Sequence, residues 1–213
     1  MLPSLSADLI DDGILAGERS MPRSPRTDGN RVELLVRNEQ YVPQLMRDLE
    51  SAKHSITVNQ FNWEPDGSGL QVAQLLERKA REGLDVRVTV DGYGIKERGR
   101  DVADALEARL AAAGVRFERT DGFKLGGTGF EHRKLITIDD SVAFTGGLGF
   151  GEKYDTWTDV MLRIEGPAAA AASGSALGTH RQLAQVADAA LQARAASIST
   201  TLRDATSGAQ QLR

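Results

Sequence analysis

Along positions 31–120, segments in which apolar residues have strand-like spacing alternate with segments in which they have helical spacing. Short apolar or alternating runs, which are typical of strands, lie at 32–36, 55–61, 85–91 and 115–119. Between these runs, apolar residues recur at helical spacing over 42–52, 68–82 and 102–113. Gly83 and Gly114 follow the last two of these segments, where a glycine commonly ends a helix. Strands that alternate with helices predict βαβ units, and therefore a largely parallel sheet covered by helices.

The pattern changes after Gly129. Two further runs, 131–138 and 141–145, are separated only by Asp139 and Asp140, which predicts a strand, a tight turn and a second strand. A last strand-like run follows at 159–165. Strands joined by a tight turn pair antiparallel, so this part adds antiparallel strands to the sheet. The expected fold class is therefore α/β, with a mixed β-sheet flanked by helices.

The two ends of the chain differ from its centre. Residues 1–30 mix Pro, Ser, Gly and charged residues without a sustained repeat, which is typical of a loosely ordered leader. Toward the other end the sequence becomes rich in alanine, and Thr179 begins the capping-box pattern of a helix. We therefore expect a leader over 1–30, one domain over 31–167 and a helical tail over 168–213.

Composition and charge exclude several kinds of site. The chain of 213 residues has no cysteine, which excludes disulfides and thiolate chemistry, and its three histidines are few for a dedicated zinc site. We expect neither a metal nor a cofactor. The formal net charge is -4 and the pI is about 5.5, whereas domains that bind nucleic acid are usually basic. Nucleic acid is therefore not expected as a partner.

The sequence contains no pattern typical of a membrane span. No stretch approaches about 18 uninterrupted apolar residues, the length that crosses a bilayer. The first residues are acidic, where a secretory signal peptide would be basic and then apolar. These features predict a cytoplasmic protein, and they leave open a peripheral contact with a membrane surface.

One segment combines residues that suit phosphate chemistry. From His132 to Asp139 the sequence has the spacing HxKxxxxD. In a strand, residues two positions apart lie on one face about 7 Å apart, so His132 and Lys134 are expected to reach one phosphate together. Asp139 ends the strand on the other face, and we expect it to be structural, accepting hydrogen bonds from turn amides.

A phosphodiester needs a particular set of groups for its cleavage. Its anionic oxygens repel nucleophiles, so a catalyst needs a neutral nucleophile, fixed positive charge and an acid for the leaving alkoxide. A neutral imidazole can form a covalent phosphohistidine, and a lysine supplies the positive charge. The acid has to come from another residue. Taken alone, however, an HxK pair is more often a histidine at a strand edge beside a solvated lysine.

Together with its flanking segments, the motif resembles the phospholipase D superfamily, which includes bacterial cardiolipin synthases, phospholipases D and some nucleases. The resemblance covers about residues 31–167 and extends to the segments NWEPDGSG, GGLGFGEKY and WTDVMLRIEGPA. It implies a phospholipase D-like half domain in which His132 is the nucleophile or the acid. By the same resemblance, Lys134 would bind phosphate and Asp159 would orient the His132 ring.

The glycines that follow the motif add one similarity and one departure. By the resemblance, Gly146 and Gly147 would lie against the bound phosphate, although a glycine pair can equally serve a tight turn. The family commonly has an asparagine that helps to hold phosphate where this chain has Gly149. An asparagine introduced at this position is therefore expected to improve substrate binding.

The chain carries one HxK motif, whereas complete members of the family combine two. A single motif implies a homodimer or a complex with a second half domain. The leading hypothesis is a phosphodiesterase or phosphatidyltransferase, similar to cardiolipin synthase, that acts on phospholipid-type phosphodiesters through a phosphohistidine. Two alternatives stay open: a non-catalytic truncated or degenerate half domain, and a nuclease of the same superfamily.

Overall fold

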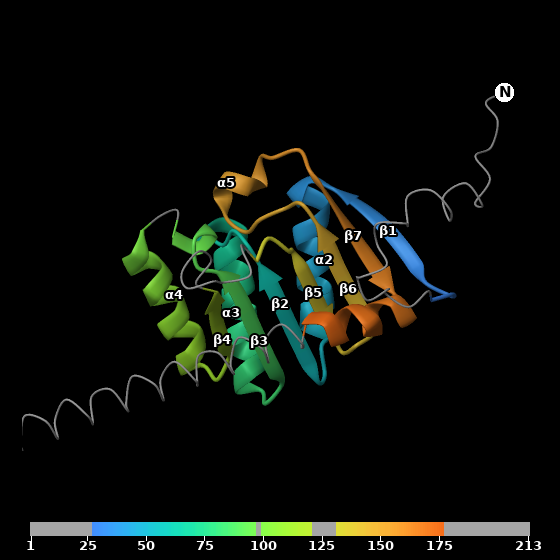
Figure 1. The fold of residues 1–213 in the computed structure, drawn as a ribbon, viewed down its shortest axis with the longest axis horizontal. Helices are drawn as coiled ribbons and strands as arrows, with labels where there is room; N and C mark the ends of the chain where they lie inside the picture. The colour runs from blue at the N-terminus through green and yellow to red at the C-terminus, as the bar shows by residue number, and fades with distance from the viewer. Residues whose placement is uncertain (1–26, 97–98, 121–130, 177–213) are drawn as a thin grey trace, which may run out of the picture.

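The computed structural model describes residues 27–96, 99–120 and 131–176, which form one seven-stranded sheet with helices packed on it (Figure 1). The strands are β1 (Arg31–Val36), β2 (Ser55–Gln60), β3 (Asp85–Asp91), β4 (Arg116–Thr120), β5 (Leu135–Ile138), β6 (Val142–Gly146) and β7 (Val160–Glu165). The helices are α2 (Arg37–Ser51), α3 (Gly67–Arg81), α4 (Arg100–Ala112), α5 (Glu152–Asp155) and the 3-10 turn η2 (Gly94–Lys96). Residues 167–176 are also helical. Most of the predicted leader and tail lies outside the described residues.

The order of the strands is β1-β7-β6-β5-β2-β3-β4. Only β2 with β3 and β3 with β4 pair in parallel, and the other four pairings are antiparallel. The predicted α/β class with a mixed sheet is therefore confirmed. The expectation of a largely parallel sheet is wrong, because β1 pairs with β7 at the far edge and β5 lies beside β2.

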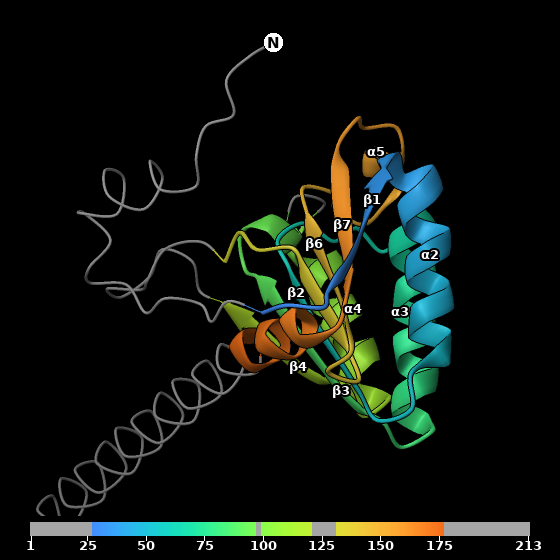
Figure 2. The same ribbon diagram turned by 90° about the vertical axis from the view of Figure 1, so that its right-hand side faces the viewer.

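Helices cover the two faces of the sheet unequally. α2 and α3 lie side by side on one face, and the helix over 167–176 lies on the other (Figure 2). β2 and β3, which are both interior strands of the sheet, are buried along most of their length. Gly83 and Gly114 follow α3 and α4 with φ of 94° in both cases, as the sequence predicts for glycines that end helices. The interior strands are therefore packed between helices on both faces of the sheet.

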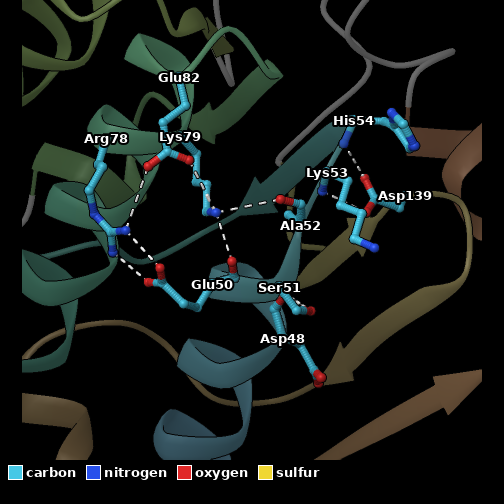
Figure 3. A network of polar contacts seen from close by, with 10 residues as sticks. All are labelled: Asp48, Glu50, Ser51, Ala52, Lys53, His54, Arg78, Lys79, Glu82 and Asp139. Atoms are coloured by element: carbon cyan, nitrogen blue, oxygen red, sulfur yellow. Dashed lines mark hydrogen bonds and ion pairs between the residues drawn. The ribbon is translucent and has the colours of Figure 1, made fainter.

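Asp139 links the turn between β5 and β6 to the connection between α2 and β2, at one end of the strands. Its carboxylate accepts hydrogen bonds of 2.8 Å from the backbone N–H groups of Lys53 and His54 (Figure 3). It also accepts the backbone N–H of Ser55 at 2.8 Å. These amides belong to the connection between α2 and β2 and to the first residue of β2, and not to the turn of Asp139 itself. Burial alone raises the pKa of Asp139, but the three backbone donors together hold that pKa below its usual value.

A lysine of α3 caps the C-terminal end of α2. Lys79 is buried, and its ammonium group donates to the backbone oxygens of Glu50 at 2.7 Å and Ala52 at 3.4 Å (Figure 3). These carbonyl groups belong to the last turn of α2, which has no further helical turn to accept from them. Glu82 forms an ion pair with Lys79 at 3.2 Å. The two helices are thereby fixed to each other.

Candidate active site

A pocket of about 390 Å³ lies at the opposite edge of the sheet from Asp139. Because β5 runs antiparallel to β2 and β6, and β7 to β6, the ends of β2 and β6 meet the beginnings of β5 and β7 there. The pocket is lined by Phe61, Asn62, His132, Lys134, Gly146, Gly147, Gly149, Tyr154, Trp157 and Asp159. All the residues that the sequence assigned to chemistry, apart from the structural Asp139, are therefore in one place.

His132 and Lys134 share this pocket, although they do not lie in a strand. β5 begins at Leu135, so the expected projection from one face of a strand is wrong. The Lys134 ammonium nitrogen instead lies 3.5 Å from both ring nitrogens of His132, and it donates to the His132 backbone oxygen at 3.2 Å. The His132 residue is exposed and Lys134 is buried. A ligand that reaches the imidazole therefore also meets the ammonium group.

Asp91 holds the segment that precedes β5, so that His132 and Lys134 lie outside the sheet. This carboxylate is fully buried at the end of β3, and it accepts the backbone N–H of Glu131 at 2.9 Å. It also accepts the Thr120 hydroxyl at 3.1 Å and the backbone N–H of Tyr93 at 2.8 Å. The residue directly before His132 is thus held by a side chain and not by a strand neighbour. A carboxylate at the end of a buried strand was the available sequence signal.

Phe61 is a second residue that the sequence did not single out. Its ring lies 4.4 Å from the His132 ring, centroid to centroid, at an interplanar angle of 51°. The Lys134 nitrogen lies 5.1 Å from the centroid of the same ring. Phe61 directly follows β2, and in the sequence it is simply the last apolar residue of that run. It limits the positions that both functional side chains can take.

The charge of Lys134 is partly removed from water. Burial lowers the pKa of Lys134 below its usual value, and the negative charge of Asp159 opposes this shift. An anion in the pocket would favour the protonated lysine in the same way as Asp159 does. Because few water molecules screen a buried cation, its attraction to an anionic ligand is stronger than at the surface.

Asp159 lines the pocket just before β7. Its carboxylate accepts the backbone N–H of Val160 at 2.7 Å, and in the described part of the chain it forms no hydrogen bond with His132. The orientation of the His132 ring by Asp159 therefore stays a prediction. Both residues line the same pocket.

The glycine pair is required by the packing of β6 against β7. A Cβ atom on Gly147 would lie 2.1 Å from a carboxylate oxygen of Asp159, and one on Gly146 would lie 2.2 Å from the backbone oxygen of Val160. Neither glycine has a positive φ. A tight turn does not explain them, because close approach to β7 is what excludes a side chain. Both glycines line the pocket, and their contact with phosphate stays a prediction.

Gly149 is excluded from carrying a side chain by an aromatic ring. A Cβ atom there would lie 3.0 to 3.2 Å from three carbon atoms of the Tyr154 ring. Tyr154 is almost fully buried, and its ring makes an edge contact with Trp157 at 5.0 Å. The structure thus argues against the expectation that an asparagine at position 149 improves binding, because Tyr154 would have to shift to admit it.

Comparison with known proteins identifies the family to which the chain belongs and solved structures with a similar fold. A family model described as "Cardiolipin synthase, PLD-like domain" matches residues 45–175. Cardiolipin synthase B of Escherichia coli (strain K12) is 32% identical over 152 residues, which are 66% of this chain and 36% of that protein. Cardiolipin synthase A of Cronobacter sakazakii is 31% identical over 163 residues, covering 67% of this chain and 32% of that protein. The chain therefore spans about a third of the length of these relatives.

Two solved structures share the fold. The phospholipase D family member Nuc from Salmonella typhimurium has a TM-score of 0.59 at 19% identity, and covers 74% of this chain and 95% of its own. NucT from Helicobacter pylori also has a TM-score of 0.59, at 15% identity, and covers 74% of this chain and 97% of its own. At these identities the likeness concerns the fold alone.

Proposed function

Because this chain belongs to the phospholipase D superfamily, we propose that it is one catalytic half of a phosphodiesterase or phosphatidyltransferase acting on phospholipid-type phosphodiesters. The observation that carries the proposal is the contact of His132 with Lys134 at 3.5 Å inside a pocket at the sheet edge. A neutral nucleophile and a desolvated cation are the two groups that an anionic diester requires.

In the proposed first step, a nitrogen of the neutral His132 ring attacks phosphorus. A bond between that nitrogen and phosphorus forms, and the bond between phosphorus and the leaving alkoxide breaks. Lys134 offsets the charge on the non-bridging oxygens, and Asp159 is expected to stabilise the ring as it becomes cationic. The leaving alkoxide takes a proton from an acid that this half does not itself supply.

In the second step, water or an alcohol attacks the phosphohistidine. The new bond between oxygen and phosphorus forms, the bond to nitrogen breaks, and His132 returns to its neutral state. The proton of the attacking hydroxyl passes to the group that acted as acid before. Water as acceptor gives hydrolysis, and an alcohol gives phosphatidyl transfer. The relatives named cardiolipin synthase support the second outcome.

The missing acid is proposed to be a second motif histidine. It would be His132 of another copy of the chain, or the corresponding histidine of a second half domain. One motif lies in the chain, and the matched part makes up about a third of the length of these relatives. In a two-fold arrangement the same residue attacks in one copy and donates a proton in the other. A peripheral contact with a lipid surface fits this substrate class. No helix in the described residues is long and apolar enough to cross a membrane.

The test compares the chain with its His132→Ala variant on mixed micelles of phosphatidylglycerol. Release of glycerol, or formation of a product with two phosphates, is followed by mass spectrometry, and circular dichroism confirms that the variant is folded. Turnover by the chain and its loss in His132→Ala support the proposal. Equal turnover by the variant would refute the mechanism. Turnover of single-stranded DNA but not of lipid would favour the nuclease alternative, and a folded dimer inactive on both would favour a non-catalytic half.

A further inference from the structure

Asn62 lies opposite Gly149 on the neighbouring segment of the pocket wall. Trp63 and Phe150 form a parallel β-bridge, in which the backbone N–H of Phe150 donates to the backbone oxygen of Asn62 at 3.2 Å. The backbone N–H of Glu64 donates in turn to the backbone oxygen of Phe150 at 2.9 Å. Asn62 and Gly149 are therefore adjacent positions on two paired segments, and both line the pocket of His132 and Lys134.

The side chain of Asn62 is oriented by a single hydrogen bond. Its amide nitrogen donates to the Tyr154 hydroxyl at 2.7 Å. An amide nitrogen carries two hydrogens, so one donor remains after this bond. The amide oxygen is buried and has no hydrogen-bond partner within the structure. An acceptor cannot bind an anionic phosphate oxygen, so the hydrogen-bonding capacity of Asn62 that suits phosphate is the remaining N–H of its amide nitrogen.

Tyr154 holds the amide in place because it is itself fixed. Its side chain is almost fully buried, and its ring packs against the backbone of Gly149 on one side and against Trp157 on another. The backbone of Asn62 is also fixed, since its oxygen accepts the Gln60 side-chain N–H at 3.1 Å. The remaining amide hydrogen is thus presented from a rigid wall, which is the property of a binding group.

We propose that Asn62 binds the phosphate of the substrate, by donating its second amide hydrogen to a non-bridging oxygen. Tyr154 acts as the positioning residue that aims the amide. This inference rests on the proposed function and extends it by one binding residue. Gly149 supplies no side chain, and the ring that excludes one there is the same ring that orients Asn62.

A purely structural role makes a different prediction. If Asn62 only supports Tyr154, any side chain that hydrogen-bonds the Tyr154 hydroxyl should suffice. Asn62→Asp keeps an acceptor for that hydroxyl but replaces the proposed phosphate donor with a negative charge. Asn62→Leu, with a side chain of similar volume, removes both the hydrogen bond to Tyr154 and the proposed hydrogen bond to phosphate. A binding role therefore predicts weaker phosphate binding in both variants, and a structural role predicts a loss in Asn62→Leu alone.

The experiment titrates inorganic phosphate into the full chain and follows two nuclear magnetic resonance signals, the side-chain amide of Asn62 and the ring of His132. We expect both to shift with one dissociation constant, and Asn62→Asp to raise that constant roughly tenfold or more, in line with a lost hydrogen bond to a charged group. A shift of His132 with no shift at Asn62, or unchanged affinity in Asn62→Asp, would overturn the inference while leaving the proposed function intact. No shift at either residue would count against both.

Discussion

Asp139 and Lys134 belong to one motif, and their surroundings shift their pKa values in the same direction with different results. Burial lowers the pKa of Lys134, so folding works against its charge, which our proposal assigns to binding an anion. Three backbone donors lower the pKa of Asp139, so folding favours its charge. In the proposed mechanism Lys134 thus provides a charge for chemistry at the expense of stability, whereas Asp139 provides a charge for stability alone.

The role of Asp139 leads to a prediction about stability and pH. A carboxylate whose folded pKa is lowered stabilises the protein above its unfolded pKa of about 3.9, and this contribution is lost as pH falls through the folded pKa. We expect Asp139→Asn to reduce the free energy of unfolding by about 1 to 3 kcal/mol at pH 7, because charged acceptors form stronger bonds. Urea unfolding at pH 7 and near pH 3 checks this, and the difference between variant and parent should shrink in acid. A difference independent of pH would contradict the account.

At the scale of elements, the site depends on the close approach of the end of β6 to the start of β7. The glycines at the end of β6 leave room for the β7 backbone and for the carboxylate of Asp159. On the facing side, Asp91 at the end of β3 holds Glu131 and so directs the motif out of the sheet. The geometry of the pocket is therefore set by three strand ends.

Gly146→Ala tests this dependence on strand packing. The added methyl group would lie 2.2 Å from the backbone oxygen of Val160 and 2.8 Å from the Cα atom of Met161, so the β7 backbone would have to shift. We expect a loss of about 1 to 3 kcal/mol in the free energy of unfolding, as for other overpacked sites. Phosphodiesterase activity should fall by at least about tenfold, the equivalent of about 1.4 kcal/mol in transition-state stabilisation. Activity and urea unfolding are measured together.

Gly174→Ala is the matched control for that substitution. Gly174 lies in the helix over 167–176, and a Cβ atom there has no heavy atom within 4 Å. Alanine is favoured over glycine in a helix, so this variant should be fully active and equally or slightly more stable, by up to about 1 kcal/mol. If Gly146→Ala behaved like this control, the close approach of β6 and β7 would not matter to the site.

Much of this arrangement follows from local patterns, and the rest depends on contacts between distant segments. Strand and helix positions up to β4 follow from the apolar repeats, because each element buries one face or stripe. The start of β5 was predicted four residues too early, since alternation at 131–138 does not reveal that Asp91 binds the Glu131 amide. The reason for the glycine pair was equally hidden, because Asp159 and Val160 approach it only in the folded chain. Asn62 opens the segment NWEPDGSG, which carries part of the resemblance, but no local pattern marks its side chain as part of the site.

For the whole molecule, the central feature is that one chain supplies one motif. The chain spans about a third of the length of its cardiolipin synthase relatives, and one His132 cannot both attack phosphorus and protonate the opposite oxygen at the same time. In the proposed mechanism an active species therefore needs a second motif, from a copy of this chain or from another half domain. A site built between two halves would assemble only when they meet.

This requirement predicts that activity depends on assembly. We expect activity per chain to fall on dilution in parallel with the dimer fraction measured by sedimentation on the same sample. The pH profile should be bell-shaped, because one His132 must be neutral and its counterpart protonated. A chain that is wholly monomeric at assay concentration and fully active would contradict the two-half model. An inactive monomer that gains activity only with a separate half domain would support it.

The covalent step on His132 is the central claim, and trapping it is the most direct test. The chain is mixed briefly with phosphatidylglycerol carrying labelled phosphorus, quenched with base, and digested for mass spectrometry. The account predicts label on the peptide containing His132, stable to base and labile to acid, as a phosphoramidate bond should be. The His132→Ala variant should carry none. Label on a different residue, or turnover without any labelled intermediate in a fully active sample, would contradict the account.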